Sequence, residues 1–350
     1  MLPQSAEPAM ARLRTRRIES PIQMKAASSL SEYGAATVER GRRDIQRILL
    51  GEDGQRLVLL SGPCSIHDPE AALEYASRLS GLANAYADQL VVIMRVYFEK
   101  PRTVLGWKGL IYDEELSGMP ASPSGLVRAR ELLLDISQMG VPCATEFLNP
   151  IVAAYIDDCI AYGSIGARTV ESQIHRELAS VLEMAVGIKN STDGSLESAI
   201  NAVKASRQPH STFICDGKGN PAIVETLGNP FAHVCLRGGR SGSNLNLVAA
   251  REVEERLAAG PLKRPIVMDC SHANSQKDYR RQKGNALDVA QMFAEGTSSI
   301  AGLMIESHLK EGSQSFETGR SLVYGQSITD GCIGWEETER LAGLIADRLK

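Results

Sequence analysis

The chain contains no apolar run as long as the roughly 20 residues that a membrane-spanning helix needs. Its first 20 residues are rich in arginine but lack the apolar segment of a secretory signal peptide. No internal repeat or low-complexity stretch is evident. These absences argue against secreted, membrane and repeat proteins, and we expect a cytoplasmic protein without a membrane partner.

The chain also lacks a basic surplus and paired cysteines. Lys and Arg number 38 against 42 Asp and Glu, which gives a net charge of −4, whereas nucleic-acid-binding domains usually carry excess positive charge. None of the seven cysteines forms a Cys-x-x-Cys pair. Scattered cysteines favour reduced thiols over a disulfide framework. We therefore expect no nucleic-acid partner, and any functional cations must be concentrated in a pocket.

Short apolar runs alternate with helical patterns along most of the chain. Continuous apolar strands are typical of a parallel sheet that is covered on both faces. Eight strand–helix units predict a closed (β/α)8 TIM barrel. An open, doubly wound sheet is the alternative, but no glycine-rich dinucleotide turn follows the first run. The runs cover residues 57–61, 91–96, 142–147, 164–167, 186–189, 233–237, 266–270 and 301–305.

The remaining segments predict the domain organisation. Residues 1–55 are expected to form an N-terminal arm, loosely ordered over 1–33, and a helix over 38–50; residues 56–350 form the catalytic barrel. Asp68-Pro69 is a typical helix start, with a capping side chain before a first-turn proline. Two short runs around Asp216-Gly217-Lys218-Gly219 predict an inserted β-hairpin before strand six. Further helices are expected over residues 124–140, 246–259, 286–294 and 337–349.

Cationic side chains end or follow many of the predicted strands. In such barrels the active site lies at the carboxyl ends of the strands. Cations brought together without anions would repel one another and lose hydration, so they predict a polyanionic ligand. Two phosphates, each with roughly −1.5 to −2 charges, and a carboxylate would match them. The six are Arg95, Lys100, Arg102, Arg168, Lys189 and Arg237. By contrast, Arg128, Arg130 and Lys204 lie on helical patterns and are expected on solvated faces.

A second set of strand-end residues offers metal ligands: Cys64, His272, Glu306 and Asp330. Taken alone, Cys64 is more typical of a small buried apolar residue. Taken alone, His272 is more typical of a capping residue. Together they offer one sulfur, one imidazole and two carboxylates. This mixture suits a borderline divalent ion such as Mn²⁺, Fe²⁺, Co²⁺ or Zn²⁺.

The motifs around these residues resemble those of the type I 3-deoxy-D-arabino-heptulosonate-7-phosphate (DAHP) synthases. The resemblance covers roughly residues 35–350, in order along the chain, and is specific as a set. Its segments are Gly-Pro-Cys-Ser-Ile-His-Asp-Pro (62–69), Met-Arg-Val-Tyr-Phe-Glu-Lys-Pro-Arg-Thr (94–103), Gly-Trp-Lys-Gly (106–109), Ile-Gly-Ala-Arg-Thr (165–169), Leu-Arg-Gly-Gly (236–239), Asp-Cys-Ser-His-Ala-Asn (269–274), Ile-Glu-Ser (305–307) and Ser-Ile-Thr-Asp (327–330).

The resemblance implies roles for individual residues. Cys64, His272, Glu306 and Asp330 would hold the metal. Lys100 would lie between the substrates as a general acid, and Arg102 and Thr103 would hold the phosphate of erythrose 4-phosphate. The phosphoenolpyruvate site would comprise Arg95, Glu146, Ala167, Arg168, Lys189 and Arg237.

The implied reaction condenses phosphoenolpyruvate with erythrose 4-phosphate and water to give DAHP and phosphate. It is the first step of the shikimate pathway to the aromatic amino acids. A homo-oligomer, dimer or tetramer, is expected. Two alternatives stay open, namely a related synthase that uses another aldose phosphate and a non-catalytic regulatory barrel.

One departure from the resembling family bears on regulation. Its members are inhibited by phenylalanine, tyrosine or tryptophan in a pocket between the segment before strand five and the hairpin. That segment is typically Leu-Ser-Cys-Pro or Leu-Ser-Met-Pro, but here Glu183 replaces the serine in Leu-Glu-Met-Ala (182–185). Thr212 and Ile214 stand where phenylalanine and serine or glycine are frequent. We therefore expect weak or no inhibition, as in a feedback-insensitive paralogue of specialised metabolism. The alternative is that Glu183 points into solvent and leaves the pocket intact.

Overall fold

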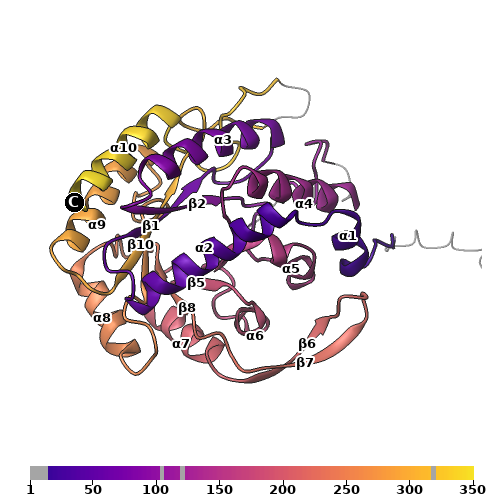
Figure 1. The fold of residues 1–350 in the computed structure, drawn as a ribbon, viewed down its shortest axis with the longest axis horizontal. Helices are drawn as coiled ribbons and strands as arrows, with labels where there is room; N and C mark the ends of the chain where they lie inside the picture. Colours follow the sequence, from indigo (N-terminus) through magenta and orange to yellow (C-terminus); the bar gives the residue numbers. More distant parts are fainter. Residues whose placement is uncertain (1–14, 103–105, 119–122, 317–320) are drawn as a thin grey trace, which may run out of the picture.

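Eight parallel strands close into a barrel in the computed structural model, which describes residues 15–102, 106–118, 123–316 and 321–350 (Figure 1). Around the barrel the order is β1-β10-β9-β8-β5-β4-β3-β2, so the first and last strands are neighbours. This closure confirms the predicted (β/α)8 barrel and rules out the open sheet. The strands are β1 (Leu57–Gly62), β2 (Leu90–Arg95), β3 (Cys143–Glu146), β4 (Ile160–Ile165), β5 (Ala185–Lys189), β8 (Ala232–Leu236), β9 (Ile266–Asp269) and β10 (Ile300–Glu306).

Helices surround the barrel and cover the outward faces of its strands (Figure 1). The predicted start at Asp68-Pro69 is confirmed, because the Asp68 carboxylate accepts hydrogen bonds from the amides of Glu70 and Ala71. The helices are α3 (Pro69–Ala85), α4 (Pro123–Gln138), α5 (Pro150–Ile156), α6 (Gln173–Val181), α7 (Leu196–Ser206), α8 (Leu247–Leu257), α9 (Gln282–Ala294) and α10 (Trp335–Arg348). Helices α5, α6 and α7 were not predicted individually, because helices of 7, 9 and 11 residues hold few apolar repeats.

Helix α2 (Glu32–Leu50) lies across the amino-terminal end of the barrel and crosses the strands in Figure 1. Its buried residues Ile45, Ile48 and Leu49 join one apolar cluster with strand residues such as Leu60 and Ile93. This packing closes one end of the barrel. Among the described residues, the open end of the barrel is therefore the one at the carboxyl ends of the strands.

The amino-terminal segment is more ordered than its polar composition predicts. Helix α1 (Pro21–Ala27) begins with a capping box formed by Ser20 and Gln23, and Ser31 caps α2. The expectation of a loose arm over residues 1–33 is thus wrong for 21–27 and 32–33, while residues 1–14 lie outside the described part. Short capped helices with few apolar residues leave little periodicity to detect.

Two further expectations are wrong. Strand β4 begins at Ile160 rather than 164, because Tyr162, Gly163 and Ser164 interrupt the apolar pattern that marks a buried strand. Arg130 is 1% exposed rather than solvated. Its guanidinium binds both carboxylate oxygens of Asp158 at 2.8 Å and donates to two backbone carbonyls. Arg128 and Lys204 are exposed, as predicted.

The predicted hairpin is confirmed as the antiparallel pair β6 (His210–Cys215) and β7 (Pro221–Thr226), at the bottom of Figure 1. Two 3-10 turns, η1 (Asp157–Cys159) and η2 (Tyr279–Arg281), complete the elements of the described residues. Within that part of the chain, no helix combines the length and apolar character needed to cross a membrane.

Candidate active site

A cavity of about 410 Å³ opens at the carboxyl ends of the barrel strands. It brings together most of the residues predicted from the sequence, although they lie up to 230 positions apart. Cys64 and Arg95 lie beneath it rather than on its lining, and Thr103 lies outside the described residues. The predicted residues on the lining are Lys100, Arg102, Glu146, Ala167, Arg168, Lys189, Arg237, His272, Glu306 and Asp330.

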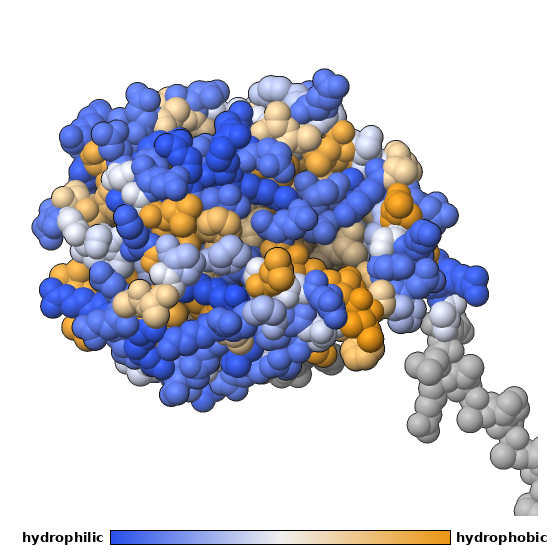
Figure 2. All heavy atoms as spheres, turned by 60° about the horizontal axis from the view of Figure 1, so that its bottom comes forward, coloured by the Kyte–Doolittle hydropathy of each residue, from blue (hydrophilic) through white to orange (hydrophobic). Residues whose placement is uncertain are grey.

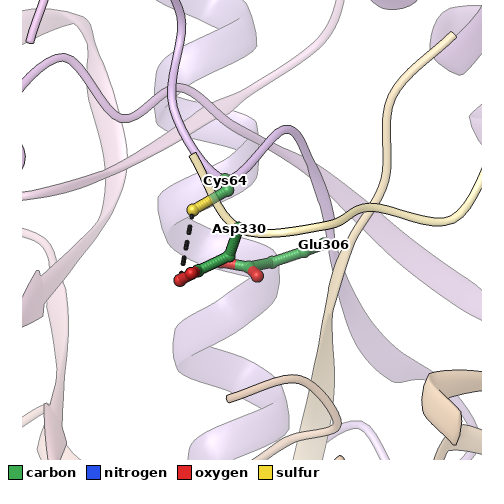
Figure 3. Close-up of side chains that lie close together, drawn as sticks. All are labelled: Cys64, Glu306 and Asp330. Carbon is green, nitrogen blue, oxygen red and sulfur yellow. Dashed lines mark hydrogen bonds between the residues drawn. The ribbon is translucent and has the colours of Figure 1, made fainter. Parts of the chain in front are cut away.

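Three of the four predicted metal ligands form a compact cluster (Figure 3). The donor atoms of Cys64, Glu306 and Asp330 all lie within 4.8 Å of one another. Cys64 follows β1 and Glu306 ends β10, and these strands pair with Gly62 opposite Glu306. Asp330 arrives from the loop before α10, where its Oδ2 atom lies 3.7 Å from the Cys64 sulfur. Closure of the barrel therefore assembles the cluster.

His272, the fourth predicted ligand, lies at the side of this cluster. Its Nδ1 atom is 2.8 Å from Asp269 Oδ2 and its Nε2 atom is 3.7 Å from Glu306 Oε1. The Ser271 hydroxyl lies 2.7 Å from Nδ1 and is itself within 2.6 Å of Asp269 Oδ1. Contacts of this kind on one ring nitrogen orient the other towards a metal site. Asp269, which is buried at the end of β9, was not predicted as a site residue. An acidic residue ending an apolar strand was the signal that could have identified it.

Charges around the cluster set the protonation of its members. Burial, together with Glu306, raises the pKa of the Cys64 thiol to about 11. Lys100 donates to the Cys64 sulfur at 3.1 Å and to its carbonyl oxygen at 3.2 Å. Burial alone would lower the pKa of Lys100, but negative charge at Cys64, Glu306 and Asp330 raises it. Lys100 is therefore a charged donor beside the cluster.

The cluster is chemically suited to a divalent cation. It offers sulfur and carboxylate donors, and the imidazole of His272 lies within reach. Buried like charges at Cys64 and Glu306 destabilise each other unless a cation lies between them. Sulfur with carboxylate oxygen suits a borderline ion rather than Mg²⁺. These residues can hold such an ion.

A buried lysine anchors the opposite side of the cavity. The Lys189 ammonium lies 3.6 Å from Glu146, 3.7 Å from Asp269 and 5.5 Å from the Tyr97 ring centre. Burial would lower its pKa, but Tyr97, Glu146 and Asp269 raise it, so Lys189 stays charged. Gly166 makes room for Glu146, because a Cβ atom there would lie 2.3 Å from the carboxylate oxygen Oε1.

Two arginines on the lining of the cavity form no ion pair with a carboxylate in the described structure. In the described part of the chain, neither Arg168 nor Arg237 has an ion-pair partner, although both line the cavity. Arg237 is positioned through its amide, which donates to Asn190 Oδ1 at 2.8 Å. Arg102 extends from the loop after β2 and donates to the Trp107 carbonyl at 2.7 Å. Three guanidinium groups are thus available to an anionic ligand.

Arg95 differs from these arginines, because it is completely buried. It donates to Glu306 Oε1 at 3.1 Å, and its guanidinium carbon lies 4.1 Å from the Tyr97 ring centre. In this arrangement it fixes a carboxylate of the cluster from below. Tyr97, which lies under both Arg95 and Lys189, was not singled out from the sequence.

Comparison with known proteins identifies the family of the chain. A family described as "DAHP synthetase I family" matches residues 23–342. The Trp-sensitive phospho-2-dehydro-3-deoxyheptonate aldolase of Enterobacter agglomerans is 47% identical over 96% of this chain and 97% of its own. The Tyr-sensitive enzyme of Escherichia coli (strain K12) is 49% identical over 92% and 90%. The structure of the Francisella tularensis SCHU S4 enzyme matches with a TM-score of 0.92 and 41% identity over 96% of this chain and 98% of that one. The chain therefore belongs to the DAHP synthetase I family.

Proposed function

We propose that this protein is a DAHP synthase, which condenses phosphoenolpyruvate with erythrose 4-phosphate and water to give DAHP and phosphate. The observation that carries the proposal is one cavity in which Arg102, Arg168 and Arg237, none paired with a carboxylate in the described structure, lie near the Cys64, Glu306 and Asp330 cluster. Two phosphates and a carboxylate match such a set of cations.

Each substrate has its own part of the cavity. Arg168, Arg237 and Lys189 bind phosphoenolpyruvate, beside Glu146 and Ala167, while Arg102 binds the aldose phosphate. Arg95 supports this site through Glu306. Thr103, outside the described residues, is proposed to assist Arg102. The charged side chains at the two ends of the cavity hold the enol carbon of one substrate against the aldehyde carbon of the other. This positioning lowers the entropic part of the activation barrier.

Cys64, Glu306, Asp330 and His272 would hold a divalent ion, one of Mn²⁺, Fe²⁺, Co²⁺ or Zn²⁺. Such an ion supplies Lewis acidity at the aldehyde oxygen when it is bound. A carbon–carbon bond forms as the enol carbon attacks the aldehyde carbon. Lys100 gives its proton to the alkoxide oxygen. Water then adds to the cationic carbon of the former phosphoenolpyruvate, and one of its protons passes to the neutral amine of Lys100. Phosphate leaves by cleavage of the C–O bond and takes the second proton as the ketone forms, while the arginines stabilise the negative charge.

Phosphate release from phosphoenolpyruvate tests this function with a panel of aldose phosphates. We expect turnover with erythrose 4-phosphate to exceed turnover with arabinose 5-phosphate and ribose 5-phosphate. Determination of the carbon skeleton of the product should identify it as DAHP. Preference for a five-carbon aldose would instead indicate the related synthase. Absence of phosphate release with every aldose in metal-supplemented buffer would leave only a non-catalytic barrel.

We also propose that the chain forms a homo-oligomer through the outer face of the hairpin. Phe213 and Ile223 are cross-strand partners and are 82% and 65% exposed. Figure 2 turns the hairpin side forward, and hydrophobic atoms gather on this face. A pair of exposed apolar side chains on the outer face of a two-stranded hairpin is typical of a surface that contacts another protein chain.

Replacing Phe213 with Asp should shift the protein to a smaller species in size-exclusion chromatography with light scattering. Val248→Asp, at an equally exposed position on α8, is the matched control and should leave the assembly unchanged. A monomeric unsubstituted protein would contradict the proposal.

Weak inhibition by aromatic amino acids is the regulatory part of the proposal. Glu183 has an 86% exposed side chain, and its Oε2 atom lies 3.5 Å from Nη1 of Arg42 on α2. Thr212 is buried and donates to Glu177 Oε2 at 2.6 Å. Glu183 thus faces solvent and Arg42. The weakened inhibition is proposed to follow from the negative charge that it adds at the edge of this segment, which would disfavour the carboxylate of an amino-acid inhibitor docked between the segment and the hairpin.

Initial rates with millimolar phenylalanine, tyrosine or tryptophan are therefore expected to stay close to the uninhibited rate. Glu183→Ser restores the serine typical of the family and should leave the basal rate unchanged. Strong inhibition of the unsubstituted enzyme by any one amino acid would refute this expectation. Loss of that inhibition in Glu183→Ala would further show that Glu183 helps to build the inhibitor pocket.

A further inference from the structure

Five cations on the cavity lining have no carboxylate partner in the described structure. One of them, Lys100, donates to Cys64, and the other four are Arg102, Arg168, Arg237 and Lys277. Three of the lining carboxylates are already engaged, since Glu146 faces Lys189, Glu306 binds Arg95, and Glu99 accepts from the hydroxyl of Tyr112. The fourth, Asp330, belongs to the cluster with Cys64 and Glu306. The proposed function assigns a ligand to the three arginines. Lys277 is left with a full positive charge and no assigned ligand.

The aldose phosphate is the substrate whose charge is least balanced. A phosphate monoester carries roughly −1.5 to −2 charges, and Arg102 alone offsets one. Phosphoenolpyruvate, by comparison, has Arg168 and Arg237 close to the buried Lys189. A second cation is therefore required on the aldose side if the cavity is to match the charge of both substrates.

Lys277 lies on the appropriate side of the barrel. Its loop follows β9, whose neighbour β10 carries Glu306 and is followed by β1 and then by β2, the strand before Arg102. The cluster thus lies between the loops of Arg102 and Lys277. Lys277 and Asp330 line the same cavity. Lys277 therefore lies on the side of the cluster, where the aldehyde end of the aldose phosphate is proposed to bind.

The backbone holds Lys277 in this place at a conformational cost. Gln276 and Lys277 have left-handed φ angles of 54° and 61°, and His272, in the same loop, has 51°. Residues other than glycine adopt this region only where the surroundings impose it, and such positions concentrate at functional sites. The Lys277 amide donates to the His272 carbonyl at 2.9 Å. The Asn274 side chain ties the loop to the carbonyls at 236 and 269, at 3.0 and 2.8 Å. One bend thus directs both His272 and Lys277 to the cavity.

We propose that Lys277 is a positioning residue for the aldose phosphate, whose phosphate it binds together with Arg102 at the mouth of the cavity. This inference rests on the proposed function. An ammonium group on a flexible stem suits the task, because it can follow a phosphate as a point charge without the fixed geometry of a guanidinium group.

Steady-state kinetics of Lys277→Met, Lys277→Arg and the control Lys310→Met test the inference. Lys310 is exposed and is absent from the cavity lining. For Lys277→Met we expect KM for erythrose 4-phosphate to rise about tenfold to a hundredfold, the usual effect of losing one charged hydrogen bond. KM for phosphoenolpyruvate should change less than about twofold. Lys277→Arg should recover most of the loss, and Lys310→Met should resemble the unsubstituted enzyme.

Unphosphorylated erythrose at high concentration provides the decisive comparison. If Lys277 acts on the phosphate, the Lys277→Met defect disappears with this substrate. A defect that persists with erythrose, an equal rise in KM for phosphoenolpyruvate, or unchanged constants for both substrates would overturn the inference. Failure of the proposed function is distinguishable, because the unsubstituted enzyme itself would then release no phosphate.

Discussion

Removing divalent ions with a chelator should abolish turnover, and Mn²⁺ or another first-row ion should restore it. The reason is the Cys64, Glu306 and Asp330 cluster, whose donor atoms lie within 4.8 Å of one another. Without a cation, burial and then the negative charge of Glu306 keep the thiol protonated, because together they raise its pKa to about 11. Ion binding must displace that proton, so affinity should increase with pH over the neutral to alkaline range.

A direct binding measurement separates this prediction from an indirect effect on activity. Titration with Co²⁺ should produce a sulfur-to-metal charge-transfer band in the unsubstituted protein, and the band should be lost in Cys64→Ser. The same substitution should weaken Zn²⁺ and Co²⁺ binding more than Mg²⁺ binding, because sulfur prefers softer ions. Cys215→Ser changes a half-buried cysteine outside the cluster and should retain the band. Full activity after exhaustive chelation, with no metal found by elemental analysis, would contradict this prediction.

Replacing Arg168 or Arg237 with Ala should act mainly on phosphoenolpyruvate, whereas Arg102→Ala should act mainly on the aldose phosphate. Loss of one partner of a charged pair costs roughly 2–5 kcal/mol, which corresponds to about a thirtyfold to several-thousandfold loss in kcat/KM. The two sets of arginines extend from different strands, β4 and β8 against the loop after β2, so their effects should separate.

Saturation curves with each substrate in turn measure this separation. Arg128→Ala is the matched control, because Arg128 is exposed on α4 and is absent from the cavity lining. It should leave both constants unchanged. If Arg102→Ala raised only KM for phosphoenolpyruvate, the assignment of the two ends of the cavity would be reversed.

The barrel was predictable because most of its strands are apolar runs that end in polar residues. The strand that ends at Glu306 shows both features, and the repeated pattern placed Lys189, Arg237 and Glu306 on one rim before any contact was known. Individual motifs with local chemistry, such as Asp68-Pro69, were equally clear, because the cap and the residues it binds are adjacent in sequence.

Features that depend on distant pairing could not be predicted. Arg130 has the helical spacing of a surface residue, and only Asp158, 28 residues later, reveals why it is buried. Arg95 resembles the other strand-end arginines, but its partner Glu306 lies 211 residues away. The role of Asp269 likewise depends on the orientation of the His272 ring. In each case the deciding partner is set by the closed barrel and not by the local pattern.

The closure of β1 against β10 also has a consequence for the order of events during synthesis. Cys64 and Asp330 are separated by 266 positions. At a translation rate of about 5–20 residues per second, the ribosome needs roughly 13–53 s to pass from one to the other. For most of that interval the thiol has been made, but its carboxylate neighbours from the last strand and the following loop have not. Binding of the proposed ion by the complete cluster would therefore be a late event, possible only after synthesis has passed Asp330 and β10 has closed against β1.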